Sequence, residues 1–160
     1  MDPTPDELAG VVDLFGALTP PELGEALAEI AFKRGDEYDP DVFEDGIDAA
    51  LDSYHLVAVD PERADRATED PLLVAGPVAF PDLPEGGTDL PHILDVPDRE
   101  LDREAAARAA AERFREDAAG AVAAGDEARI RALVDVSYEL EAWGPVELAQ
   151  ARERLDAALA

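Results

Sequence analysis

The sequence has no cysteine, one lysine (Lys33) and two serines (Ser53 and Ser137) among its 160 residues. Without cysteine, the chain cannot form a disulfide, a thiolate nucleophile or a zinc–thiolate site. Neither serine lies in a Gly-x-Ser-x-Gly motif, and no glycine-rich loop leads into a helix that carries a lysine. The sequence therefore offers little for serine hydrolase chemistry or for a phosphate-binding loop, and we predict no cofactor.

The N-terminus has no basic segment followed by an apolar one, so it does not have the pattern of a secretory signal. No apolar run approaches the roughly 18 residues that a membrane-spanning helix needs. We therefore expect a soluble, cytoplasmic protein with no membrane partner.

Acidic residues dominate the composition, with 39 Asp and Glu against 13 Lys and Arg and a formal net charge of −26. The acids are spread along periodic segments rather than gathered in a tail. In about 1 M salt the screening length falls to roughly 3 Å, so neighbouring carboxylates repel one another little. We interpret the surface as one suited to molar salt, and an acidic protein of ordinary salt is the alternative.

Three helices and two strands are predicted over residues 1–80. Thr4 and Thr19 each precede a proline and a glutamate at the spacing of a capping box. An acidic amphipathic helix is expected over Pro40–Tyr54, followed by strands at His55–Val59 and Leu72–Ala75, the second continuing at 78–80. Residues 60–70 are polar and expected to form a loop. This order predicts a winged-helix-like domain.

Residues 81–98 form a linker rich in proline and glycine, whose apolar middle we expect to lie against the body of the protein. Residues 99–160 are predicted to be helical, with breaks at Gly125 and at Gly144-Pro145 that give a helical hairpin or three-helix bundle. The predicted fold class is mainly α with a small β-hairpin, an α+β arrangement.

Three segments resemble an uncharacterised family of small acidic haloarchaeal proteins: Glu7–Thr19, Leu90–Pro97 and Asp135–Trp143. The resemblance extends over nearly the whole chain. It implies adaptation to high salt, but it brings no activity and no catalytic residue.

In a winged helix, one helix enters the DNA major groove, and the composition of the corresponding helix here argues against nucleic-acid binding. Its span, 40–54, has no Lys, Arg, Asn or Gln and has five acids. Contacts to phosphate drive DNA binding and weaken steeply with salt. The nearest basic pair, Lys33 and Arg34, is interpreted as the end of the preceding helix, although a DNA-binding dimer that gathers its few cations is an alternative.

Two histidines are candidates for a metal or acid–base site. His55 follows the acidic helix and His92 lies in the linker, so the two could meet only if the linker folds back. Their spacing matches no metal motif, and we interpret both as structural.

Arginines and aromatics near the C-terminus suggest partner contacts. Seven arginines are either a site for an anion or acidic partner or, as we favour, members of ion pairs within helices: Arg99, Arg103, Arg108, Arg113, Arg115, Arg129 and Arg131. Trp143 and Tyr138 are the candidate partner-binding anchors, and core packing is the alternative for both.

The sequence thus predicts a protein of unknown function, interpreted as a non-enzymatic module that binds protein through a winged-helix-like shape. A DNA-binding regulator acting as a dimer, and a small enzyme or metal-binding protein using His55 and His92, are the alternatives. The sequence does not indicate the oligomeric state.

Overall fold

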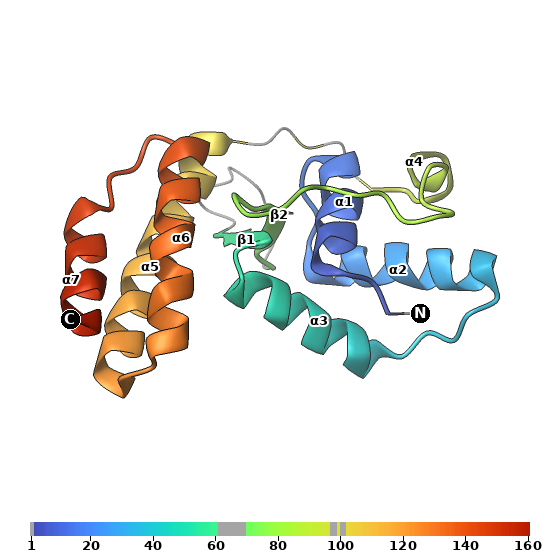
Figure 1. Ribbon diagram of the computed structural model, residues 1–160. Coiled ribbons are helices and arrows are strands. Elements are labelled where there is room, and N and C mark those ends of the chain that lie inside the picture. The colour runs from blue at the N-terminus through green and yellow to red at the C-terminus, as the bar shows by residue number, and fades with distance from the viewer. Residues whose placement is uncertain (1, 61–69, 97–98, 100–101) are drawn as a thin grey trace. The chain divides into compact units, whose positions relative to one another are not determined.

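The computed structural model describes residues 2–60, 70–96, 99 and 102–160, and these residues form seven helices and two strands (Figure 1). The chain divides into two compact units, Met1–Asp102 and Arg103–Ala160, here called the N-terminal and C-terminal units. The secondary structure is mainly helical with one small antiparallel sheet, which confirms the predicted α+β class. Most of the expected loop, residues 61–69, lies outside the described residues.

The first two helices of the N-terminal unit begin where the capping boxes predict. Helix α1 spans Pro5–Phe15, and the Thr4 hydroxyl accepts the Glu7 N–H while the Glu7 carboxylate accepts the Thr4 N–H. Helix α2 spans Pro20–Arg34, with the same reciprocal pair between Thr19 and Glu22. Both starts are confirmed because a capping box is local and can be read from four residues.

Helix α3 spans Pro40–Asp52 and starts at Asp39, whose carboxylate accepts the Asp41 N–H at 3.0 Å. It ends two residues before the predicted Tyr54. The N–H groups of Tyr54 and His55 turn back to the carbonyls of Leu51 and Ala50, which is the pattern of a Schellman motif. Tyr54 takes the left-handed position with φ of +64°, and its side chain is fully buried.

The two strands lie in the predicted segments, β1 at Leu56–Val59, starting one residue later than predicted, and β2 at Leu72–Ala75, paired antiparallel with Leu56 opposite Ala75. Leu18, between α1 and α2, forms an isolated bridge to Leu73 through two backbone hydrogen bonds of 3.1 and 2.7 Å. Leu18 therefore pairs with the free edge of β2 as a one-residue bridge, which the sequence did not predict.

The predicted continuation of the second strand at 78–80 is wrong. The chain leaves the sheet at Gly76, which lies so close to the Tyr54 carbonyl that a Cβ would overlap it. The Gly76 N–H donates to the His55 carbonyl and the Val78 N–H to the Tyr54 carbonyl, so both groups are used in a turn. Pro77 between them has no N–H to offer a partner strand.

The stretch after β2 packs on the N-terminal unit. Its short helix α4, Leu90–Ile93, places Leu90 fully inside the core, and Leu83, Leu94 and Val96 pack against the same cluster. The Asp82 N–H donates to the Asp6 carbonyl at 3.0 Å. The compact unit therefore includes residues 81–96, predicted as a linker packed on the body, and Arg99, predicted as the start of the helical region.

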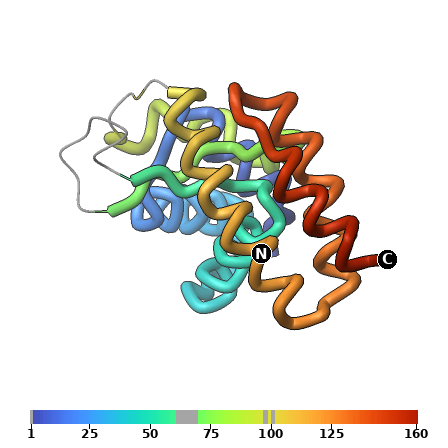
Figure 2. Tube along the Cα trace, turned by 90° about the vertical axis from the view of Figure 1, so that its left-hand side faces the viewer, coloured from blue at the N-terminus to red at the C-terminus, as the bar shows by residue number. Residues whose placement is uncertain are grey.

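The C-terminal unit contains α5 (Arg103–Ala124), α6 (Glu127–Trp143) and α7 (Ala149–Leu159), which lie side by side (Figure 2). Alanines of α5 fill much of its interior around Phe114. Helix α7 begins four residues after the predicted Pro145. The reason is that the Leu148 N–H, just before the helix, donates to the Glu141 carboxylate on α6 at 2.9 Å.

Candidate functional site

A groove of about 560 Å³ on the N-terminal unit lies between α2, α3 and the sheet, and it is here called the α2–α3 groove. Its floor is apolar, with Phe43 and Leu73 almost fully buried. The walls carry the following small and aliphatic side chains: Pro20, Gly24, Ala28, Ile47, Leu51 and Ala58. The size is that of a site for a small ligand or for a few side chains of a partner.

The charge of the groove has a single sign. Glu25 on α2 and Glu44 and Asp48 on α3 belong to its lining, and no basic side chain does among the described residues. All three carboxylates are exposed at positions where water still hydrates them. An apolar floor with an acidic rim favours a ligand that is apolar in its middle and positively charged at its edges.

The local sequence explains why the groove is open. Gly24 and Ala28 lie one turn apart on α2, so this face of the helix has almost no side-chain bulk. A Cβ on Gly24 would lie 3.3 Å from the Tyr38 hydroxyl, which is closer than usual. The Tyr38 ring packs on Phe43 with 4.8 Å between centroids, and both residues line the groove.

Lys33 and Arg34, the two candidate nucleic-acid residues, both lie close to carboxylates. The Lys33 Nζ lies 3.9 Å from Asp89, and the Arg34 Nε lies 3.3 Å from Asp36. Arg34 also ends α2, beside Gly35 in the left-handed conformation. Their positive charge is thus partly compensated within the unit.

The two histidines have different surroundings. The His55 Nδ1 shares a hydrogen bond of 2.7 Å with the Ser53 hydroxyl, and its Nε2 lies 3.7 Å from the Asp6 carboxylate. Ser53 also donates to the Ala50 carbonyl, and Asp6 accepts the Phe80 N–H, so both are engaged in holding backbone. His92 is exposed on α4, and within the described ranges no group of three His, Asp or Glu side chains is placed to hold a metal.

Residues 6–160 match the family of unknown function DUF7109. The chain belongs to this family. The expected membership of an uncharacterised family is therefore confirmed. No curated protein and no solved structure matches the chain, and within the described residues no helix is long and apolar enough to cross a membrane.

The two candidate aromatic anchors of this DUF7109 protein lie on α6, and each carries a guanidinium on its ring. Arg152 stacks on Tyr138 at 4.1 Å from the ring centroid, and Arg103 on Trp143 at 4.7 Å. Tyr138 is 57% exposed, so core packing does not describe it, whereas Trp143 is half-buried. Each ring is thus partly covered by a side chain of its own unit.

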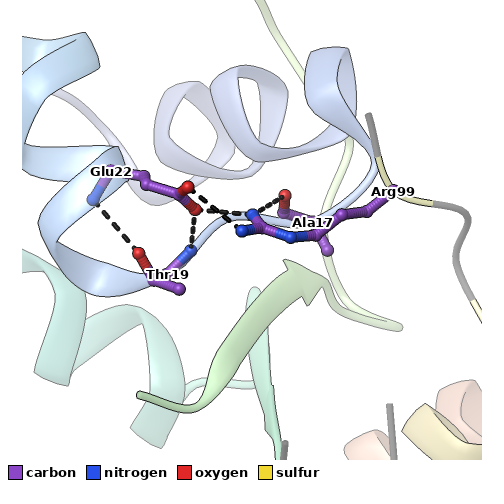
Figure 3. Close-up of polar contacts among 4 residues, drawn as sticks. All are labelled: Ala17, Thr19, Glu22 and Arg99. Atoms are coloured by element: carbon purple, nitrogen blue, oxygen red, sulfur yellow. Dashed lines mark hydrogen bonds and ion pairs between the residues drawn. The ribbon is translucent and has the colours of Figure 1, made fainter. Parts of the chain in front are cut away.

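The arginines predicted to pair within helices follow two patterns. Arg108, Arg113 and Arg131 do form ion pairs four residues away along their helices. Arg99 does not, because its guanidinium is buried in the N-terminal unit, where it meets both oxygens of Glu22 and donates to the Ala17 carbonyl (Figure 3). Its partner lies 77 residues away in the sequence, so the pairing of residues three or four apart on a helix could not predict it.

The Arg99–Glu22 contact also fixes the protonation of Glu22. Burial disfavours the charged carboxylate, but the hydrogen bonds from Arg99 and from Thr19 outweigh burial and hold the pKa of Glu22 below its ordinary value of 4.5. Glu22 therefore serves two purposes, since it completes the capping box of α2 and anchors the segment after α4.

Proposed function

We propose that the protein is a non-enzymatic interaction module, adapted to high salt, in which a winged-helix-like unit binds a basic, apolar segment of another protein in the α2–α3 groove. The observation that carries the proposal is the groove itself. It combines an apolar floor with the three carboxylates of Glu25, Glu44 and Asp48 and has no basic lining among the described residues. A site of this chemistry complements a cationic amphipathic segment.

The winged-helix-like shape is supported by the order of elements. Helix α1 is followed by the extended Leu18, by the helix pair α2 and α3, and by the hairpin of β1 and β2. The bridge from Leu18 to Leu73 joins the first connection to the last strand. Under this proposal α3 corresponds to the second helix of a helix-turn-helix, the helix that enters the DNA groove.

The same position argues for protein rather than DNA as the partner. The exposed side of α3 carries five carboxylates, Asp41, Glu44, Asp45, Asp48 and Asp52, which would meet phosphate charges of the same sign. Lys33 and Arg34 lie next to α3 in sequence, but both are close to carboxylates. A DNA-binding dimer would need its cations from elsewhere.

Adaptation to high salt is supported by the charge. A net charge of −26 on 160 residues creates repulsion that dilute buffer leaves largely unscreened. Molar salt removes this cost while the carboxylates keep the surface hydrated. The haloarchaeal resemblance of the sequence is in line with this interpretation.

The experiment is site-specific photo-crosslinking in molar KCl. A photoreactive amino acid replaces Ala28, which lines the groove, or Ala49, which is exposed on α3 and does not line it. We expect the Ala28 probe to crosslink a defined protein through a segment that contains both basic and apolar residues, and the Ala49 probe not to crosslink that segment.

The matched control is a charge reversal on α2 and α3. Replacing the groove acids by lysine (E25K, E44K, D48K) should abolish the crosslink from Ala28. The same change of charge outside the groove (D41K, D45K, D52K) should leave it in place. Crosslinking to DNA, or equal loss with both triple variants, would contradict the proposal.

A further inference from the structure

A second groove lies on the C-terminal unit between α5 and α7, with a volume of about 640 Å³, and it is here called the α5–α7 groove. Most of its lining side chains are small, and the lining residues recur at steps of three and four along each helix. Helix α5 contributes Ala119, Val122 and Ala123, and helix α7 contributes Ala151, Ala157 and Ala158. Val122 is 38% exposed, so a valine and several alanines face water here.

Two arginines belong to the lining of this groove, Arg115 from α5 and Arg154 from α7. Neither forms an ion pair with a carboxylate among the residues that the structure describes, and Arg115 only donates to the Glu147 carbonyl at a long 3.4 Å. The five arginines of the unit that do have a carboxylate partner lie elsewhere: Arg108, Arg113, Arg129, Arg131 and Arg152. No carboxylate lines the groove within the described part of the chain.

The contrast is informative because the chain has three acidic residues for each basic one. With carboxylates so abundant, an arginine without one on the rim of an apolar groove is available to a ligand. We propose that the α5–α7 groove binds an amphipathic helix of a partner protein, whose apolar stripe lies on the alanines and whose flanking Asp or Glu residues meet Arg115 and Arg154. This site is independent of the α2–α3 groove and takes a partner of the opposite charge.

The shape of the groove supports a helix as the occupant. Its lining on α5 runs from Arg115 to Ala123, a rise of about 12 Å or two helical turns. Alanine walls let a third helix approach the other two closely, and apolar anchors at steps of three and four then face the channel. Guanidinium groups at its edge can bind carboxylates with two parallel hydrogen bonds.

A second copy of the chain fits less well. A symmetric contact through this groove would bring four arginines together, two from each copy, without any carboxylate in the lining to offset them. An acidic helix from another protein supplies that missing charge.

The test uses the full-length protein in molar KCl and two synthetic helical peptides of about 18 residues, or five turns. Both have the same Leu and Ala stripe, flanked by Glu in one peptide and by Lys in the other. Binding is followed by fluorescence anisotropy. We expect one molecule of the Glu peptide to bind, and the Lys peptide to bind at least about tenfold more weakly.

Two pairs of variants locate the binding. The double variant R115E/R154E should lower the affinity for the Glu peptide by about tenfold or more. The double variant R108E/R131E makes the same change of charge at exposed positions and should lower this affinity by less than about twofold. Ala119→Trp should fill the groove and block the peptide, and Ala128→Trp on the exposed side of α6 should not.

Several results would overturn the proposal. These are equal affinity for the two peptides, equal weakening by the two arginine pairs, or no binding of either peptide. Displacement of the Glu peptide by oleate, with oleate binding lost on Ala119→Trp, would assign the groove to an anionic amphiphile instead. A dimer in analytical ultracentrifugation that Ala119→Trp dissociates would assign it to a second copy.

Discussion

The two units of this protein differ sharply in charge. Residues 1–102 contain 27 acidic and 5 basic residues, a net charge of −22, whereas residues 103–160 contain 12 and 8, a net charge of −4. The acidity of the chain is therefore concentrated in one unit and is not a general property of its surface. Repulsion between like charges, and with it the dependence on salt, should follow the same division.

The units also use arginine differently. In the N-terminal unit the buried Arg99 joins segments 77 residues apart. In the C-terminal unit arginines lie near the surface and join neighbouring turns or helices, as Arg152 does with Glu141 at 2.8 Å across 11 residues. Losing one arginine should therefore cost the first unit more than the second.

The largest single effect is expected for Arg99→Ala. The substitution leaves the Glu22 carboxylate and the Ala17 carbonyl without their buried partner, and because Glu22 is partly exposed and keeps its bonds to Thr19, the cost should be roughly 2–4 kcal/mol. Urea denaturation in molar KCl should show the loss by far-UV circular dichroism. The fluorescence of Trp143, the only tryptophan, reports the C-terminal unit and should keep its midpoint.

The control for this prediction is Arg34→Ala, which removes an exposed ion pair with Asp36. Its effect should stay within about 0.5 kcal/mol. If the two variants were equally stable, the Arg99 contact would not be what fastens the segment after α4.

A second prediction applies one substitution to both units. Gly10 on α1 lies against the backbone of Asp82, and an added Cβ would overlap it, so Gly10→Ala should destabilise the protein by about 1–3 kcal/mol. Gly120 on α5 faces open space, so Gly120→Ala should stabilise the protein by about 0.5–1 kcal/mol. Thermal unfolding in molar KCl measures both changes, and equal signs would contradict the packing described here.

A third prediction, of a smaller loss of stability, concerns the pH dependence of Glu141. Hydrogen bonds from Arg152 and from the Leu148 N–H hold the pKa of Glu141 below its ordinary value of 4.5. A lowered pKa in the folded state means that Glu141 contributes stability above about pH 4.5 and loses it as pH falls through the folded value. Glu141→Gln should cost roughly 0.5–1 kcal/mol at neutral pH, since solvent screens the pair, and the cost should shrink as pH falls below 4.5. Trp143 fluorescence in urea at several pH values measures this difference, and a constant cost at all pH values would contradict it.

Local signals in the sequence predicted much of this fold. The starts of α1, α2 and α3 depend on Thr4, Thr19 and Asp39, whose side chains bond within three residues. Both strands lie in the predicted segments because β-branched and aliphatic runs mark them, although the second strand ends at Ala75 and does not continue at 78–80. These features depend on neighbours along the chain, which a sequence displays directly.

The features that the sequence did not predict depend on residues far apart in the chain. The end of α3 needs a buried Tyr54 in the left-handed conformation, and the start of α7 follows Leu148, whose N–H is held by Glu141. The role of Arg99 depends on Glu22, and the α2–α3 groove depends on three segments that meet only in the fold. Gly24 and Ala28 one turn apart were the one available hint that a face of α2 is kept open.

The central claim, that salt dependence belongs to the N-terminal unit, is tested most directly by hydrogen exchange with mass spectrometry on the full-length chain. Exchange is compared in molar KCl and in about 0.05 M KCl, where the screening length exceeds 10 Å. We predict that amides of α1, α2 and α3 lose protection in dilute salt while those of α5, α6 and α7 keep it. Equal loss in both units, or unchanged protection in the first three helices, would contradict the claim.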